Sequence, residues 1–174
     1  FLADNGCGSD SYGISILSPE GFVVTKNLDK LPVKKVLAAL KKKVKESNSV
    51  IGHTRQATCG DVNIANAHPF ISEDKRITLI HNGVIQDWEK KTEELKKLGH
   101  SFSGTTDSEI LLHTFEENLK TIKEPTFEEI AETMNKTCNT SSSVNTIIQL
   151  LDGTIVAFAD FRLYKNVGKG YVLL

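Results

Sequence analysis

Three polar segments of this chain carry residue types that together suit a free amino acid. Arg55 lies in the segment 52–60, and its planar guanidinium can hold a carboxylate through two parallel hydrogen bonds. Asp107 can pair with an ammonium, while Asn82 and Gly83 offer a side-chain and a backbone N–H to a developing oxyanion. The combination predicts a pocket in which the side-chain carbonyl of a bound amino acid is attacked.

Each of these residues also has an ordinary structural explanation. An isolated arginine such as Arg55 is typical of a surface ion pair, and Asn82-Gly83 is typical of a tight turn between strands. Asp107 at the start of a helix is typical of capping or of dipole stabilisation, and a lone His68 before proline is more often structural than catalytic. The chemical interpretation therefore depends on the segments meeting in one cleft.

The bulk composition favours one globular domain. The chain has 174 residues, of which 39% are hydrophobic and 25% are charged, enough for a sizeable core. The formal net charge of -1 disfavours a nucleic-acid or anionic-membrane surface. No apolar run approaches the roughly 18 residues of a spanning helix. We therefore expect neither a nucleic-acid partner nor a membrane association.

The cysteines and histidines favour a reduced, metal-free protein. Cys7, Cys59 and Cys138 are odd in number and widely spaced, which favours free thiols in a cytoplasmic setting over a disulfide framework. No Cys-x-x-Cys or His-x-x-x-His pair suggests a zinc site. No signal-peptide pattern stands at the beginning of the sequence. No metal and no cofactor are expected.

The elements that must position the polar segments can be read from the apolar pattern. Strands are predicted at residues 13–17, 21–25, 49–54, 77–80, 145–151, 154–158 and 170–174. The strand at 49–54 leads into the Arg55 loop, and the strand at 77–80 ends at Asn82. Turn chemistry at 18–21 and at Asp152-Gly153 joins neighbouring strands.

Helices are predicted between these strands. Apolar residues recur at helical spacing at 33–44 and 88–98. Capping-box patterns begin two more helices, one at Thr106 with Glu109 and one at Thr126 with Glu129. Strands in adjacent pairs favour antiparallel sheets, and the grouped helices favour an α+β fold with layers of sheet and helix.

The polar segments occur in the order found in one family. They resemble the glutaminase domain of class II glutamine amidotransferases, which are N-terminal nucleophile hydrolases, of the glucosamine-6-phosphate synthase and amidophosphoribosyltransferase types. The resembling segments are Gly8-Ser9-Asp10-Ser11-Tyr12-Gly13, residues 52–60, Asn66-Ala67-His68-Pro69, Ile80-His81-Asn82-Gly83 and Thr106-Asp107-Ser108-Glu109. Five ordered segments cover most of the chain, so an accidental match is disfavoured.

The resemblance implies a fold, a reaction and roles for the site residues. The fold is a four-layer αββα sandwich of two antiparallel sheets, and the reaction hydrolyses L-glutamine to glutamate and ammonia. Arg55 is assigned to the glutamine α-carboxylate and Asp107 to the α-ammonium. Asn82 and Gly83 form the oxyanion hole. Thr58 and His81 are carried over as wall or supporting positions of the substrate pocket.

The chain departs from the family at the nucleophile. The family uses a cysteine at the mature N-terminus, whose own α-amine serves as the base. That cysteine is expected before Phe1, so enzymatic activity is expected only if it exists there. Cys7 stands where the family's first motif has arginine, and its alignment does not fit a nucleophile. Gln56 and Cys59 replace the family's tryptophan and histidine beside the arginine.

Several alternatives stay open from the sequence. Residues 1–174 are expected to form one glutaminase domain that lacks its N-terminal strand, and the abrupt apolar end raises the alternative that the C-terminal end is also incomplete. Ammonia would pass to an acceptor-synthase domain or partner subunit, whose substrate is left open. A domain without the nucleophile would instead bind glutamine or glutamate, or act as a scaffold. A homo-oligomer is also left open.

Overall fold

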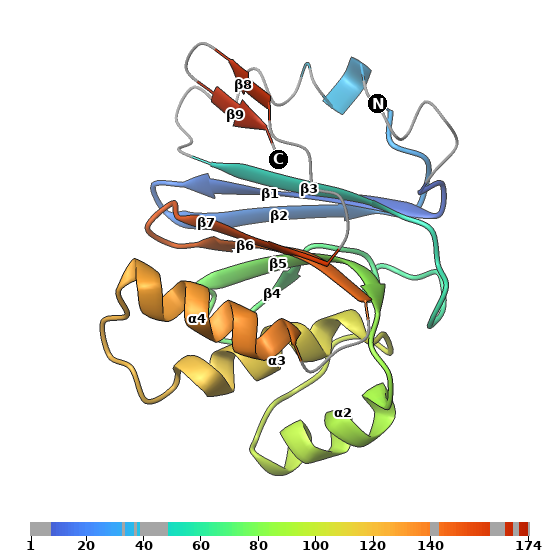
Figure 1. Cartoon of the computed structure of the whole chain (residues 1–174). Coiled ribbons are helices and arrows are strands. Elements are labelled where there is room, and N and C mark those ends of the chain that lie inside the picture. Colours follow the sequence, from blue (N-terminus) through green and yellow to red (C-terminus); the bar gives the residue numbers. More distant parts are fainter. Residues whose placement is uncertain are drawn as a thin grey trace.

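Two antiparallel sheets stacked face to face form the centre of the molecule (Figure 1). The computed structural model describes residues 8–32, 34–36, 38, 49–139, 143–160, 166–168 and 171–173. The first sheet has the order β2-β1-β3, with β1 at Ser11–Ser18, β2 at Gly21–Asn27 and β3 at Val50–Arg55. The Ser18 hydroxyl donates to the Gly21 carbonyl at 2.9 Å in the predicted turn between β1 and β2.

The second sheet has the order β4-β5-β6-β7. Its strands are β4 at Phe70–Ile71, β5 at Ile77–Val84, β6 at Ser143–Leu150 and β7 at Ile155–Ala159. The Asp152 carboxylate accepts from the Thr154 backbone N–H at 2.8 Å, and Gly153 has a φ of 92°, so the predicted turn before β7 is confirmed. A separate pair joins β8 at Asn166–Gly168 to β9 at Tyr171–Leu173, which confirms the last predicted strand.

Two helices, α3 and α4, cover the outer face of the second sheet, and a third, α2, packs against α3 (Figure 1). They are α2 at Trp88–Lys97, α3 at Ser108–Leu119 and α4 at Phe127–Cys138. The predicted capping box of α4 is present, with Thr126 and Glu129 each bonded to the other's backbone. The expected helix at 33–44 lies mostly outside the described residues, as does the start of the chain. An α+β fold with two antiparallel sheets is confirmed.

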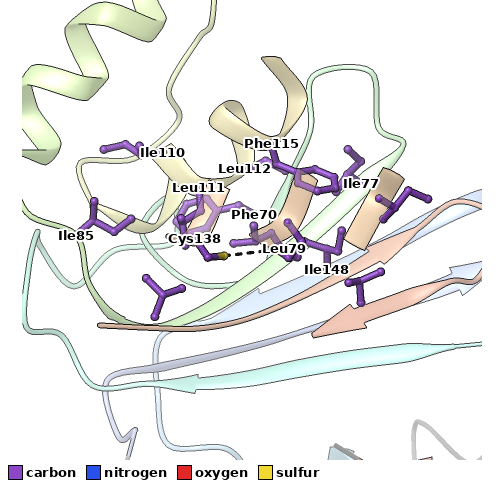
Figure 2. Packing of buried hydrophobic residues seen from close by; sticks show 14 of the residues in the cluster. Phe70, Ile77, Leu79, Ile85, Ile110, Leu111, Leu112, Phe115, Cys138 and Ile148 are labelled. Atoms are coloured by element: carbon purple, nitrogen blue, oxygen red, sulfur yellow. Dashed lines mark hydrogen bonds between the residues drawn. The ribbon is translucent and has the colours of Figure 1, made fainter. Parts of the chain in front are cut away.

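The hydrophobic core lies between these helices and the second sheet (Figure 2). The inner face of α3 supplies several of its members, as its helical spacing predicts: Ile110, Leu111, Leu112 and Phe115. They pack against Phe70, Leu79 and Ile148 from the sheet. The burial of these side chains fixes α3 on the sheet, and with it the residues just before the helix.

A polar cluster sets how the two sheets face each other. Gln149 is fully buried, and its side-chain oxygen accepts from Ser15 at 2.9 Å and from Thr78 at 3.1 Å. The hydroxyl oxygens of Thr78 and Ser15 lie 3.2 Å apart. These bonds join β1 of one sheet to β5 and β6 of the other. Because buried polar groups lose stability without partners, this cluster disfavours any sliding of one sheet on the other.

Two local predictions were wrong. The strand expected to end at residue 80 continues as β5 to Val84, because Asn82 and Gly83 pair with Asn145 and Val144 of β6. The capping box expected at Thr106 and Glu109 does not form. The Glu109 carboxylate instead accepts from the backbone N–H groups of Ser103 and Gly104, both at 2.9 Å, and α3 begins only at Ser108.

None of the helices in the described part of the chain combines the length and the apolar character that a membrane crossing requires.

Candidate functional site

Arg55 and Asn82 lie on the facing sides of the two sheets. Ser15 contacts Thr78 across the sheets, and Ser15 pairs with Ile51 of β3, so Ile51 and Thr78 share the inner space. Side chains alternate along a strand and cross-strand partners share a face. Arg55 and Asn82 each lie four residues further along their strands and therefore face the same space.

The ends of β3 and β5 meet at that space. The His53 ring hydrogen-bonds the backbone of His81, which joins the two strands directly. His53 also lies 3.0 Å from His68 between their Nδ1 atoms, so the segment before β4 closes the same end. Asn82 is exposed, so solvent reaches this residue near the end of β5. The strand geometry thus gathers three of the predicted segments at one end of the intersheet space.

Arg55 is buried but keeps part of its guanidinium unpaired. Its side chain is 7% exposed, and its Nη2 donates to the Cys59 carbonyl. Its Nη1 has no hydrogen-bond partner among the described residues. A buried guanidinium N–H without an acceptor costs at least about 1–3 kcal/mol, so the site favours an incoming anion such as a carboxylate.

The loop after Arg55 is held by the first predicted motif. The Asp10 backbone N–H donates to the Arg55 carbonyl at 3.1 Å, and the Asp10 carboxylate accepts from the Ala57 N–H at 2.8 Å. Gly8 lies so close to Thr54 that an added Cβ would stand 2.5 Å from its hydroxyl. The Asp-Ser-x-Gly element therefore positions the arginine loop. Thr58 is exposed on that loop, and its predicted role at the pocket wall stays a prediction.

Asp107 is buried at the start of α3. Its Oδ2 accepts from the Ile85 backbone N–H at 2.9 Å, just beyond the end of β5, and its Oδ1 accepts from Ser108 at 3.3 Å. The same Ser108 hydroxyl bonds His81 Nδ1 at 2.9 Å. Asp107 makes no ion pair with Arg55 or with any other described cation. Its carboxylate is therefore buried without a cationic partner among the described residues.

The three histidines His53, His68 and His81 are neutral at physiological pH. Burial lowers the pKa of His53 to about 4, and the neighbouring His81 and Arg55 add to the effect. Burial also lowers the pKa of His81 to about 4, although the Asp107 carboxylate opposes the shift. The pKa of His68 falls well below its ordinary value for the same reason. Arg55 therefore stands as a positive charge beside neutral imidazoles.

Asn66 ties the arginine loop to the aspartate loop, which the sequence analysis missed. Its amide N donates to the Asp61 carbonyl at 2.9 Å and to the Thr105 hydroxyl at 3.2 Å, while its amide O accepts from the Thr105 N–H at 2.7 Å. An added Cβ at Gly104 would stand 2.5 Å from that amide O. The only sequence signal was the place of Asn66 in the Asn-Ala-His-Pro element.

Asn82 and Gly83 are placed by the extended strand rather than by a turn. Gly83 has a φ of 151°, which a side chain rarely adopts, so glycine suits this position. The structure thus places Arg55 and Asn82 at one end of the intersheet space. The side chain of His81 lies on the other face of β5, where it bonds Ser108 of α3, and Asp107 bonds the Ile85 N–H just beyond the strand end. The assigned roles of these residues in binding and catalysis stay predictions.

The chain is similar in sequence to known amidotransferases. A family described as glutamine amidotransferase domain matches residues 38–125. The glutamine–fructose-6-phosphate aminotransferase of Thermus thermophilus is 42% identical over 113 residues, which are 65% of this chain and 18% of that protein. The corresponding protein of Sulfurisphaera tokodaii is 38% identical over 120 residues, or 68% of this chain and 20% of that protein. The chain spans about a fifth of these relatives.

Solved structures share the fold at low identity. The glutamine phosphoribosylpyrophosphate amidotransferase of B. subtilis superposes with a TM-score of 0.58 and 20% identity, over 83% of this chain and 30% of that one. A class-II glutamine aminotransferase domain protein from Silicibacter pomeroyi gives a TM-score of 0.56 and 15% identity, over 90% of this chain and 72% of that one.

Proposed function

Because this chain belongs to the class II glutamine amidotransferase domain family, we propose that its intersheet cleft binds L-glutamine and hydrolyses the side-chain amide. The products are glutamate and ammonia. The single observation that carries the proposal is the pair of buried, unmatched charges: Arg55 keeps a free Nη1, and Asp107 has no cationic partner among the described residues. A zwitterion supplies the opposite charge to each.

The charges orient the substrate. The Arg55 guanidinium donates hydrogen bonds to the α-carboxylate, and Asp107 pairs with the α-ammonium. Hydrogen bonds to the protein fix both side chains: Arg55 donates to the Cys59 carbonyl, and Asp107 accepts from the Ile85 N–H. With the α-centre fixed, the side-chain amide of glutamine extends towards Asn82 and Gly83. This geometry favours glutamine over amides that lack either charged group.

The reaction proceeds through a covalent intermediate. The family's nucleophilic cysteine, expected before Phe1, transfers its thiol proton to its own α-amine and attacks the amide carbon. The carbonyl oxygen becomes an oxyanion, which accepts from the Asn82 amide and the Gly83 N–H. Collapse breaks the C–N bond, and the ammonium group returns the proton to the leaving nitrogen as ammonia departs. Water then hydrolyses the thioester to glutamate and frees the thiol.

The ammonia is passed to an acceptor synthase domain or subunit. The relatives that this chain matches are named for amino transfer to fructose-6-phosphate or for amidotransfer involving phosphoribosylpyrophosphate, and the chain spans only a part of each. A phosphorylated sugar is therefore the acceptor class that the comparisons favour. The alternative function is binding of glutamine or glutamate without hydrolysis, in a protein whose upstream sequence lacks the cysteine.

Labelling of the native protein tests the proposed hydrolysis. 6-Diazo-5-oxonorleucine, an electrophilic glutamine analogue, should attach to a single N-terminal cysteine and abolish the release of glutamate. The label is located by mass spectrometry of the N-terminal peptide. Attachment at Cys59, or no attachment together with no glutamate release, would contradict the hydrolase and leave the binding function.

A further inference from the structure

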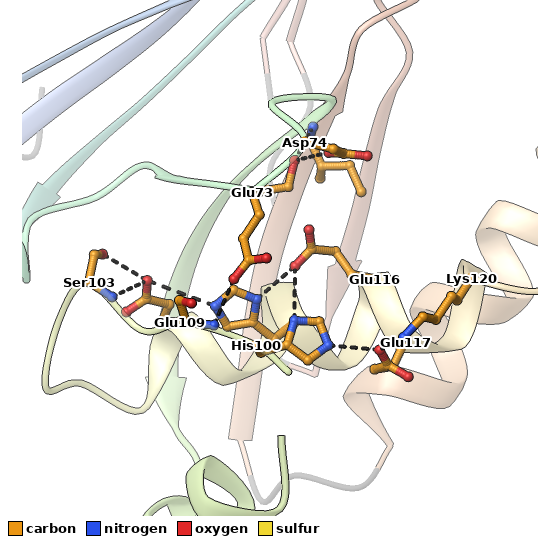
Figure 3. A network of polar contacts seen from close by, with 12 residues as sticks. Glu73, Asp74, His100, Ser103, Glu109, Glu116, Glu117 and Lys120 are labelled. Atoms are coloured by element: carbon orange, nitrogen blue, oxygen red, sulfur yellow. Dashed lines mark hydrogen bonds and ion pairs between the residues drawn. The ribbon is translucent and has the colours of Figure 1, made fainter. Parts of the chain in front are cut away.

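A second group of titratable side chains lies where the segment after α2 meets α3 (Figure 3). His100 comes from that segment, while His113 and Glu116 come from one face of α3. One ligand atom of each residue lies within 4.8 Å of the others. Nothing in the glutamine site uses these side chains.

The atoms of this group that lie nearest one another have spacings close to those around a small tetrahedral cation. Glu116 Oε2 lies 2.7 Å from His113 Nδ1 and 3.8 Å from His100 Nδ1. Ligands on a tetrahedral zinc ion stand about 3.3 Å apart, given zinc–nitrogen bonds of about 2.0–2.1 Å. These two distances lie on either side of that value, and all three ligand atoms lie within 4.8 Å of one another, so binding of the cation requires rotation of the side chains.

The distal nitrogens of both rings face carboxylates. His100 Nε2 lies 2.9 Å from Glu117, and His113 Nε2 lies 3.9 Å from Glu109 with no hydrogen-bond partner among the described residues. A neutral imidazole carries only one N–H. At His100 that N–H faces Glu117, so the Nδ1 lone pair faces Glu116, as in metal-binding histidines whose ring is oriented by an outer carboxylate. At His113 the 2.7 Å contact makes Nδ1–H a donor to Glu116, and a bound cation would replace that proton.

The outer carboxylates are themselves held in place. Glu109 accepts from the Ser103 N–H at 2.9 Å, from the Ser103 hydroxyl at 2.7 Å and from the Gly104 N–H at 2.9 Å. Glu117 accepts from Lys120 at 2.8 Å, which lowers the pKa of its carboxyl, with further help from His100. Three carboxylates thus surround two imidazoles, and a positive charge between them is favoured.

We propose that His100, His113 and Glu116 form a binding site for a divalent cation of the zinc type. Two imidazoles and one carboxylate are a common ligand set for zinc, with a water molecule as the fourth ligand. The side chains of His100 and Glu116 are 10% and 16% exposed, so solvent and metal reach the site from one side. The bound cation ties the segment leading to Asp107 onto α3.

Cobalt and zinc binding to the untagged, chelator-treated chain tests this site. One Co²⁺ per chain should give the strong visible absorption of a tetrahedral complex, and Zn²⁺ should displace it and raise the melting temperature. Glu116→Gln keeps the shape of the side chain but loses the anionic ligand. It should remove the cobalt absorption and weaken Zn²⁺ binding by about 100-fold or more, measured by calorimetry.

Two further variants sharpen the result. Glu117→Gln alters only the outer partner of His100 and should weaken Zn²⁺ binding by about 10-fold. Glu128→Gln, an exposed glutamate in the first turn of α4, is the matched control and should bind as the unsubstituted chain does. If circular dichroism shows that Glu116→Gln does not fold, His100→Gln replaces it.

The site is refuted by either of two outcomes. One is the absence of a tetrahedral cobalt spectrum, which would mean that protons on the two imidazoles balance the carboxylates. The other is unchanged zinc affinity in the folded Glu116→Gln or His100→Gln variant, which would place the metal elsewhere.

Discussion

The two histidine clusters of this protein have opposite electrostatic surroundings. Burial lowers the pKa of His53, His68 and His81, and the positive charge of the neighbouring Arg55 adds to the effect at His53 and His68. His100 and His113 face glutamates on both ring nitrogens. The first cluster excludes further positive charge and leaves Arg55 for an anion. The second cluster favours a cation. The same residue type therefore serves two different ligands according to its neighbours.

The largest expected effect is at the anionic end of the glutamine site. Asp107→Asn keeps an oxygen for the Ile85 N–H but removes the charge that pairs with the α-ammonium. A hydrogen bond to a charged group is worth about 1.5–3 kcal/mol, so glutamine affinity should fall by about 10- to 150-fold. Calorimetry of glutamine binding measures this. Asp29→Asn, at an exposed position, is the control and should bind normally.

The next effect separates the two histidine clusters by pH. His53 and His81 have a pKa of about 4 in the folded protein and about 6.5 in the unfolded chain. Between pH 4 and pH 6.5, unfolding therefore lets each of these histidines bind a proton. The contribution of each histidine to stability is complete above pH 6.5 and is lost as the pH falls towards 4. The free energy of unfolding should drop by about 2 kcal/mol per histidine between pH 7 and pH 5.

Replacing His53 isolates the contribution of one buried histidine to the pH dependence of the free energy of unfolding. Urea denaturation of His53→Gln at a series of pH values should show a shallower decline than the unsubstituted chain. His100 and His113 are present in both proteins, so their contribution cancels when the pH dependence of the variant is subtracted from that of the unsubstituted chain. Identical slopes for the two proteins would show that His53 is not held neutral, and the contrast between the clusters would be lost.

The smallest of these effects is the loss of glutamine affinity when the planar guanidinium of Arg55 is replaced by an ammonium group. Arg55→Lys preserves the positive charge but not the planar fork, and it loses the bond to the Cys59 carbonyl. Glutamine affinity should fall by about 10-fold, while Arg76→Lys, at an exposed position, should change nothing. Equal affinity in both variants would remove Arg55 from the substrate site.

The sequence was sufficient for the elements with regular patterns. The helical spacing before and after Leu111 predicted the buried face of α3, and Thr126 with Glu129 predicted the start of α4. Both signals are local and depend on side chains within one or two turns. They survive folding because no distant residue competes for the same groups.

Other features could not be predicted because distant residues decide them. Glu109 was expected to cap α3, but the N–H groups of Ser103 and Gly104 take its carboxylate. The strand at 77–80 was expected to end before Asn82, but β6 pairs with Asn82 from more than sixty residues away and extends the strand. The Asn66 cross-link joins residues 39 positions apart. None of these partners follows from a local pattern.

The cation site was missed for a related reason. His113 and Glu116 are three residues apart on a helix, a spacing that occurs often without a metal. The third ligand, His100, comes from a connecting segment whose path only the folded chain defines. Sequence spacing typical of zinc sites was therefore absent, although the ligands converge in space.

The most direct measurement compares L-glutamine with its des-amino analogue on the unsubstituted chain and on Asp107→Asn. If Asp107 pairs with the α-ammonium, the unsubstituted chain should bind glutamine about 10- to 150-fold more tightly than the analogue, and the variant should bind both about equally. If the variant retains the full preference for glutamine, the ammonium lies elsewhere and the proposed orientation of the substrate in the cleft is contradicted.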